Sequence, residues 1–115
     1  MRDCTITHQQ EGDLDFLFIN GSLDSYSFPK LEVALQGLVD QSRLRVVLDC
    51  AGLEYISSVG LGALIGFTRS AREKNGDLKL VNLSDRIYNI IELLGFQKIL
   101  EIHAGQDEAV ASFAS

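Results

Sequence analysis

Apolar residues recur along the chain with two different spacings, and the shorter spacing predicts strands. Residues 4–10 and 14–23 lie on either side of the turn-like segment 11–13, which predicts two strands joined as a hairpin. Residues 44–50 form a short, mostly apolar run with two valines, as expected for a strand buried on both faces of a sheet. Residues 77–83 and 97–103 predict two more strands.

The longer spacing predicts helices between these strands. Residues 27–42 have an amphipathic pattern with Pro29 near the first helical position and apolar residues at Phe28, Leu31, Leu35 and Leu38. A second core stripe starts after Val59 and ends near Asn75 and Gly76; it comprises Leu61, Leu64, Ile65, Thr68 and Ala71. Residues 105–115 predict a short final helix.

Residues 84–95 predict a helix with recognisable ends. Ser84 is suited to the N-cap and Gly95 to the C-terminal cap. The residues expected on its buried face are Ile87, Ile90, Ile91 and Leu94. The whole order is β, β, α, β, α, β, α, β, α, which predicts an α/β fold: a mixed sheet with an N-terminal hairpin, then parallel strands, and about four helices. We expect residues 1–115 to form one domain.

Composition narrows the possible partners and the compartment. The net charge is -6 and no cluster of basic residues occurs, which argues against a nucleic-acid partner. The longest uncharged apolar run, Val59 to Phe67, is far shorter than the roughly 20 residues that span a bilayer, so we expect no membrane insertion. The first thirteen residues lack the apolar segment of a secretory signal, and we therefore expect a cytoplasmic protein.

The residues that could bind a metal are few and far apart in sequence. Cys4 and Cys50 have no CxxC spacing and are most simply free thiols, with Cys50 at the end of a buried strand. His8 and His103 are expected on strands near the surface. Since no pair has the spacing of metal ligands, we expect neither a metal nor a cofactor.

The segment "SSVGLGALIG" is the one place where polar residues suggest chemistry. It lacks the GxSxG pattern of a nucleophile elbow, the lysine of a P-loop and the spacing of the dinucleotide fingerprint, and nothing marks a histidine as the partner of Ser57 or Ser58. We therefore expect no enzymatic activity. One of the two serines is expected to cap the following helix, and the positive end of the helix dipole there also favours a phosphate group.

Together, the residues "VVLDCAGLEYISSVGLGALIGF" resemble the anti-sigma factor antagonist family, whose fold is the STAS domain. The resemblance extends to "INGSLDSYSFPKLEVAL" and to "KNGDLKLVNLSDRIYNIIELLGFQKILEIH", and so covers nearly the whole chain. Aligned on Gly60, Leu61 and Gly62, it implies that Ser58 is the phosphorylated residue, with Ser57 as second choice. Ser57 stands where the family has an aspartate, and Asp24 matches the family's aspartate before the first helix.

The resemblance also implies a partner and a surface. The partner is an anti-sigma factor that is also a serine kinase; it would bind the unphosphorylated protein and release it after ATP-dependent phosphorylation of Ser58, which a serine phosphatase reverses. The residues expected on the partner-binding surface are Asp24, Ser57, Ser58, Val59, Gly60, Leu61, Gly62, Ala63 and Phe67. Asp24 can equally be a turn-forming acid.

Several alternatives stay open from the sequence. Val59, Ala63 and Phe67 form either a buried face beneath another element or an apolar contact strip beside the serines. Arg69, Arg72, Glu73 and Lys74 are expected on a solvated face. The function could instead be that of a non-phosphorylated STAS scaffold or sensor, or, as the weakest hypothesis, of a small enzyme that binds a phosphate-containing ligand.

Overall fold

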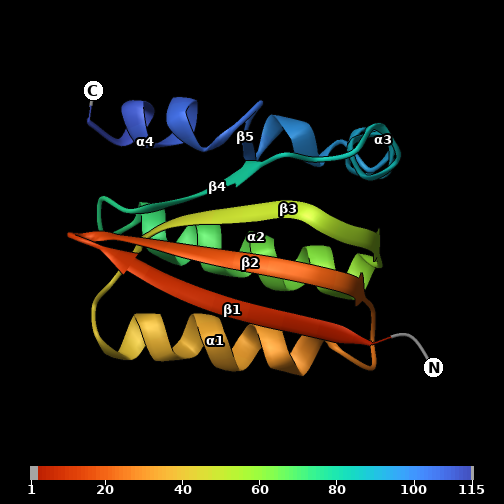
Figure 1. The fold of residues 1–115 in the computed structure, drawn as a ribbon, viewed down its shortest axis with the longest axis horizontal. Helices are drawn as coiled ribbons and strands as arrows, with labels where there is room; N and C mark the ends of the chain where they lie inside the picture. Colours follow the sequence, from red (N-terminus) through yellow and green to blue (C-terminus); the bar gives the residue numbers. More distant parts are fainter. Residues whose placement is uncertain (1–2, 115) are drawn as a thin grey trace.

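The computed structural model describes residues 3–114 and is built on one five-stranded sheet (Figure 1). The strands are β1 (Cys4–Glu11), β2 (Leu14–Leu23), β3 (Arg45–Ile56), β4 (Asp77–Val81) and β5 (Glu101–His103). The helices are α1 (Phe28–Asp40), α2 (Ser58–Arg72), α3 (Asp85–Leu93), the short 3-10 helix η1 (Phe96–Lys98) and α4 (Gln106–Ala114).

The strands are ordered β1-β2-β3-β4-β5 across the sheet. β1 and β2 pair antiparallel as a hairpin, with Gly12 in the turn at a φ of 61°, and all later neighbours pair parallel. The predicted mixed α/β architecture and the order of its elements are therefore confirmed, apart from the added η1.

One predicted strand is longer in the structure. β3 was expected to end at Cys50, but it continues to Ile56 because β2 offers a partner along this whole length. Shifts of register between Phe18 and Asn20, and again between Gly21 and Ser22, keep the two strands paired up to Leu23 and Ile56. The extra residues carry β3 directly to the serine pair.

The last predicted strand is shorter in the structure. Residues 97–103 were expected to be extended, but Phe96–Lys98 form η1 and only Glu101–His103 pair with β4. The left-handed Gly95, with a φ of 76°, reverses the chain at the end of α3 and starts the 3-10 turn. Leu100 is buried just before β5, so the apolar residues that suggested a strand serve the core from a turn.

Two faces of the sheet carry two unequal apolar clusters. The large cluster lies between the sheet and α1, α2 and α3, and includes Leu31 and Leu35 of α1 together with Ile87 and Ile91 of α3. Ser84 caps α3 as predicted, its Oγ accepting a hydrogen bond from the Ile87 N–H at 3.2 Å. Leu94, expected on the buried face, is 47% exposed because the helix ends there.

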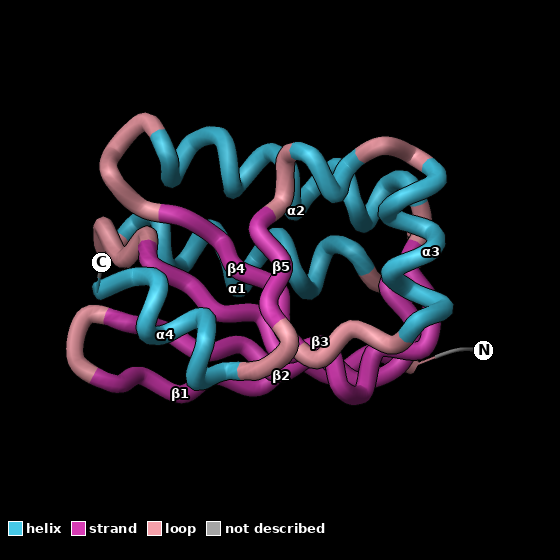
Figure 2. Tube along the Cα trace, turned by 90° about the horizontal axis from the view of Figure 1, so that it is seen from above, coloured by secondary structure: helices cyan, strands magenta, loops and turns pink. Residues whose placement is uncertain are grey.

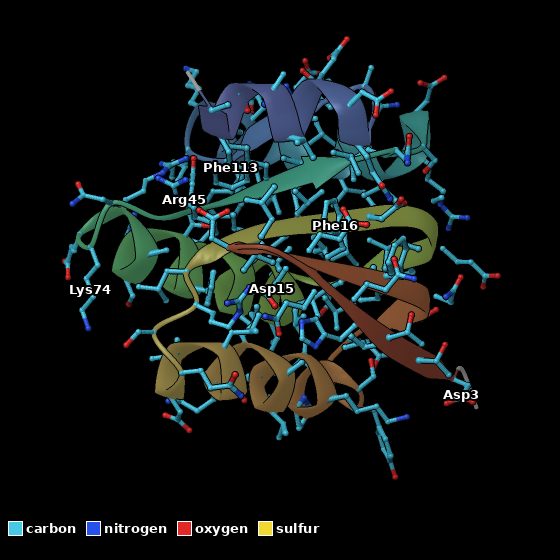
Figure 3. The ribbon with its side chains drawn as sticks, turned by 60° about the vertical axis from the view of Figure 1, so that its left-hand side comes forward. Asp3, Asp15, Phe16, Arg45, Lys74 and Phe113 are labelled. Atoms are coloured by element: carbon cyan, nitrogen blue, oxygen red, sulfur yellow. The ribbon has the colours of Figure 1, made fainter. Side chains whose placement is uncertain are left out.

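The opposite face of the sheet is covered by α4, and Figure 2 shows α2 and α4 on opposite sides of the strands. Phe16 of β2 and Phe113 of α4 belong to this small cluster, and both are labelled in Figure 3. Lys79 is 5% exposed beneath α4; its ammonium group lies 4.2 Å from the centre of the Phe113 ring and hydrogen-bonds to Ser112. The small cluster thus depends partly on a buried cation.

The carboxylate of Glu101 partly neutralises the buried Lys79. Glu101 accepts hydrogen bonds from Lys79 at 3.3 Å and from His103 at 2.8 Å. Partial burial raises the pKa of the Glu101 carboxyl, but the hydrogen bonds from His103 and Lys79, the positive charge of Lys79 and a hydrogen bond with Asp77 lower it, and the pKa lies below its usual range. The carboxylate of Glu101 is therefore part of what attaches β5 and α4 to the sheet.

The cysteines and histidines lie where no chemistry is evident. Cys4 and Cys50 are free and buried, and burial raises the pKa of both thiols. Cys50 lies within β3, not at its end. His8 is on β1 as expected, and its Nε2 lies 2.6 Å from the buried carboxylate of Asp15, which also accepts from Arg43 Nε at 2.7 Å.

Gly60 fixes how closely α2 approaches the end of β2. A Cβ at Gly60 would lie 2.8 Å from Leu23 Cγ and 3.1 Å from the Leu23 carbonyl oxygen, and Leu23 is fully buried. A Cβ at Gly62, two residues along the same helix, would meet nothing within 4 Å. The two glycines of "GLG" therefore have different structural roles.

These roles predict opposite effects of alanine. Gly60→Ala should lower the free energy of unfolding by roughly 1 to 3 kcal/mol, because the added Cβ would clash with the buried Leu23 side chain and approach its carbonyl oxygen too closely. Gly62→Ala should leave it unchanged or raise it by up to about 1 kcal/mol, because alanine favours the helix. Urea unfolding of both variants tests this; an equal effect of the two substitutions would contradict it.

The lowered pKa of Glu101 predicts a dependence of stability on pH. A carboxyl whose pKa is lower in the folded state contributes stability above its unfolded pKa of about 4.3, and that contribution is lost as the pH falls through the folded value. Glu101→Gln should therefore be less stable than the wild type at neutral pH, and the difference should shrink below pH 4 or so. Urea unfolding at several pH values measures it, with the exposed Glu54→Gln as control. A difference that is independent of pH would refute the assignment.

Candidate functional site

The serine pair lies at the junction of β3 and α2, and Ser57 is the helix cap. Its backbone is extended, with φ of -91° and ψ of 169°, and its Oγ accepts a hydrogen bond from the Gly60 N–H at 3.2 Å. The Ser57 N–H donates to the Leu23 carbonyl at 2.8 Å, which joins the cap to the end of β2. Of the two serines that the sequence offered as caps, the structure selects Ser57.

Ser58 is the first residue of α2 and has a different environment. It is exposed, and in the described part of the chain no hydrogen bond engages its hydroxyl group. The first turn of α2 contains no acidic residue, so the positive end of the helix dipole has no carboxylate beside it within that turn. The capping role and the accessible hydroxyl thus belong to separate residues, Ser57 and Ser58.

Asp24 follows β2 and organises the loop before α1. Its Oδ1 accepts hydrogen bonds from the N–H groups of Tyr26 at 2.9 Å and Ser27 at 3.1 Å, and from Ser27 Oγ at 3.1 Å. The turn-forming role is therefore real. Because its neighbour Leu23 bonds to Ser57, Asp24 also lies at the same end of the sheet as the serine pair.

An apolar groove runs between α1 and α2 from the start of α2. It has a volume of ≈ 420 Å³, and its lining includes four of the residues predicted for a partner surface: Val59, Gly62, Ala63 and Phe67. Val59 is 43% exposed, Ala63 is partly buried and Phe67 is 7% exposed. Both alternatives from the sequence hold in part: the strip is exposed next to Ser58 and becomes buried against the neighbouring helix.

Two predicted surface residues lie beneath this strip. Leu61 is fully buried in the large cluster, and Gly60 is buried against Leu23. Both set the position of the first turn of α2 without facing solvent. The residues Arg69, Arg72, Glu73 and Lys74 are exposed as expected, and Arg72 makes an ion pair with Asp77 at 3.0 Å.

Sequence reasoning missed the α1 side of the groove. Phe28, Leu35 and Val39 line it together with the polar residues Glu32 and Gln36. The periodic pattern had placed Phe28 and Leu35 in the core, and both do contribute to the large cluster. A pattern of apolar positions identifies the face that a helix buries, but it does not show where two packed helices leave a gap.

Within the described residues, neither histidine contacts the serine pair. The Nε2 atom of His8 contacts Asp15 and that of His103 contacts Glu101. Among residues 3–114, no group of three or more His, Cys, Asp or Glu side chains could hold a metal ion. Within the same range, no helix is both long and apolar enough to cross a membrane. What the site presents is an exposed hydroxyl at a helix N-terminus beside an apolar groove.

Comparison with known proteins matches most of this chain to one domain family. The STAS domain family profile matches residues 5–109. The anti-sigma-B factor antagonist of Bacillus subtilis is 34% identical over 103 residues, which are 89% of this chain and 92% of that protein. The anti-sigma-B factor antagonist of Listeria monocytogenes is 33% identical over 95 residues, covering 81% and 83%.

Solved structures share the fold over almost the whole chain. An anti-sigma factor antagonist from Mycobacterium paratuberculosis superposes with a TM-score of 0.83 at 23% identity, covering 98% of this chain and 96% of that one. The phosphorylated form of the Bacillus cell fate determinant SpoIIAA gives 0.72 at 16% identity, covering 94% and 98%. On the family profile and the relatives of similar sequence, this chain belongs to the STAS domain family of anti-sigma factor antagonists.

Proposed function

We propose that residues 1–115 form a single STAS domain that works in the cytosol as an anti-sigma factor antagonist, controlled by phosphorylation of Ser58. The protein acts by binding and not by catalysis. In the unphosphorylated state, the first turns of α2 and the α1–α2 groove bind an anti-sigma factor that is also a serine kinase. This binding frees the sigma factor, or another output protein, that the anti-sigma factor holds.

The observation that carries the proposal is the separation of the two serines. Ser57 is committed to the cap, whereas Ser58 presents its hydroxyl to solvent directly beside the exposed part of the apolar strip. A kinase bound to the groove would have the Ser58 hydroxyl within its interface. The names of the relatives in Bacillus subtilis and Listeria monocytogenes support an anti-sigma factor as the partner.

The chemical step transfers a phosphoryl group from ATP bound by the partner. Ser58 Oγ attacks the γ-phosphorus, the bond to the β,γ-bridging oxygen breaks, ADP leaves and a base on the kinase accepts the hydroxyl proton. The product carries about -1.5 to -2 charges at the mouth of an apolar groove. Docking an apolar partner surface there would then require burying that charge, so the complex dissociates. Hydrolysis by a serine phosphatase restores the hydroxyl.

The fold should tolerate this modification. The dipole and the free N–H groups of the first turn favour an anion, and no acidic residue of that turn repels it. SpoIIAA, which has the same fold, has been solved in a phosphorylated form. Because phosphorylation of Ser58 would change the surface and leave the core intact, the phosphate could be added and removed repeatedly without unfolding the protein.

A STAS scaffold that is not phosphorylated is the alternative. Ser57 occupies the position of the family's aspartate, and no other carboxylate replaces it in the first turn of α2. If a kinase needs that carboxylate for recognition, Ser58 would remain a plain surface residue. The two readings differ in what a negative charge at Ser58 does to partner binding.

Ser58 is predicted to be the residue that accepts the phosphate. After incubation with its anti-sigma factor kinase and Mg-ATP, the wild type and Ser57→Ala should gain one phosphate by intact mass, whereas Ser58→Ala should gain none. Ser57→Ala should also lose about 1 kcal/mol of stability, because the Gly60 N–H loses its cap, and Ser58→Ala should lose little. Undiminished phosphorylation of Ser58→Ala would reject the assignment.

A negative charge at Ser58 distinguishes a phosphorylation switch from a scaffold that is not phosphorylated. Ser58→Asp should unfold at the same denaturant concentration as the wild type or higher, since a charge at this helix end stabilises by roughly 0.3 to 1 kcal/mol. Its affinity for the anti-sigma factor, measured by titration calorimetry, should nevertheless fall by about 100-fold, the equivalent of some 2.7 kcal/mol. Asn89→Asp, exposed on α3 and outside the groove, is the matched control and should bind as the wild type does. Unchanged affinity of Ser58→Asp would favour the scaffold.

A further inference from the structure

The sheet has one long edge that no described strand covers. β1 is the outermost strand, eight residues long, and pairs only with β2. It contains neither proline nor lysine, two residues that commonly protect such edges from pairing. β5, at the other edge, has only three residues. β1 is therefore the edge with room for a further strand.

The direction of the backbone groups along β1 follows from two hydrogen bonds. The Asp3 carbonyl accepts from the Ser22 N–H at 3.1 Å, so residue 3 and every second residue after it point toward β2. The Cys4 carbonyl points the other way and accepts from Lys30 Nζ at 2.8 Å. Ile6, His8 and Gln10 share the outward direction, and within residues 3–114 their outward N–H and C=O groups have no partner.

A groove borders this edge on the side of α1. It has a volume of ≈ 630 Å³ and lies between the first residues of β1, Cys4–Ile6, and the α1 residues Pro29, Lys30, Val33 and Ala34. Val33 is 73% exposed, although valine is usually buried. Figure 1 shows α1 running alongside β1, and no α1 residue of this groove lines the α1–α2 groove. The groove is thus separate from the α1–α2 groove.

The ends of the edge carry negative charge. Asp3 precedes β1 and its side chain is 85% exposed, and Figure 3 shows it at the outer end of the strand. Glu11 ends β1 and is also exposed. The Lys30 ammonium group, 3.5 Å from Asp3 Oδ1, partly offsets the negative charge of Asp3, but the net charge of the whole chain is -6. A partner segment with basic residues at its ends would match this edge.

We propose that the β1 edge and the groove beside α1 form a strand-addition site for an extended segment of a partner protein. The segment pairs its backbone with the outward groups of Ile6, His8 and Gln10. It places every second side chain, apolar, against Val33 and Ala34, because side chains alternate between the faces of a strand. Basic residues at its ends lie near Asp3 and Glu11. This site is independent of Ser58 and extends beyond the proposed switch.

A synthetic octapeptide tests the site: alternating threonine and valine with a lysine at each end, acetylated and amidated. Added to the 15N-labelled protein, it should slow hydrogen exchange of the Ile6, His8 and Gln10 amides by about tenfold or more, since these gain a partner. The amides of Thr5, Thr7 and Gln9 already point toward β2 and serve as internal controls. Ser58→Asp should bind the peptide as the wild type does.

Two lysine substitutions distinguish a contribution of the groove to peptide binding from a general effect of added positive charge. Val33→Lys should weaken peptide binding about tenfold, because it places a like charge in the apolar groove. Leu93→Lys is the matched control, since Leu93 is 87% exposed on α3, and it should bind as the wild type does. The proposal is overturned if the three amides gain no protection at the peptide's solubility limit, or if Val33→Lys binds unchanged. Protection that appears without peptide and rises with protein concentration would assign the edge to a second copy and also overturn it.

Discussion

The geometry of the candidate site depends on the parallel pairing of β2 and β3 along their full length. Because the two strands end together at Leu23 and Ile56, the first residue after β3 can bond to the last carbonyl of β2. That bond places Ser57 as the cap of α2, and the missing side chain of Gly60 lets the first turn approach Leu23. Ser58 then becomes the first residue of α2, and its side chain is exposed.

The buried junction limits what a phosphate at Ser58 can change. Residues that hold the junction together, such as Leu23, Gly60 and Leu61, are buried, and the residue proposed to be modified is not. A charge added at the surface therefore changes what a partner meets while the capping bond and the core persist. Because Ser57 makes the capping bond and Ser58 does not, a phosphate could be added to Ser58 and removed again without breaking that bond.

Much of this could be read from the sequence, and the failures have identifiable causes. Alternation, periodicity and capping residues located every strand and α-helix, including the cap at Ser84, because these signals are local. The extension of β3 to Ile56 and the short 3-10 turn at Phe96 depended on neighbouring strands and on Gly95, which no local pattern reports. Sequence also could not decide which serine caps α2, since either hydroxyl fits; the bond from Ser57 to Leu23 decides it.

The central claim is that the partner binds around Ser58 and leaves when Ser58 is phosphorylated. Its most direct test is an amide NMR titration of the 15N-labelled protein with its anti-sigma factor, before and after kinase treatment. The account predicts shifts at the start of α2 and along the α1–α2 groove, and their loss in the phosphorylated protein, whose own spectrum changes only near Ser58. Shifts confined to another face, or binding that persists after phosphorylation, would contradict it.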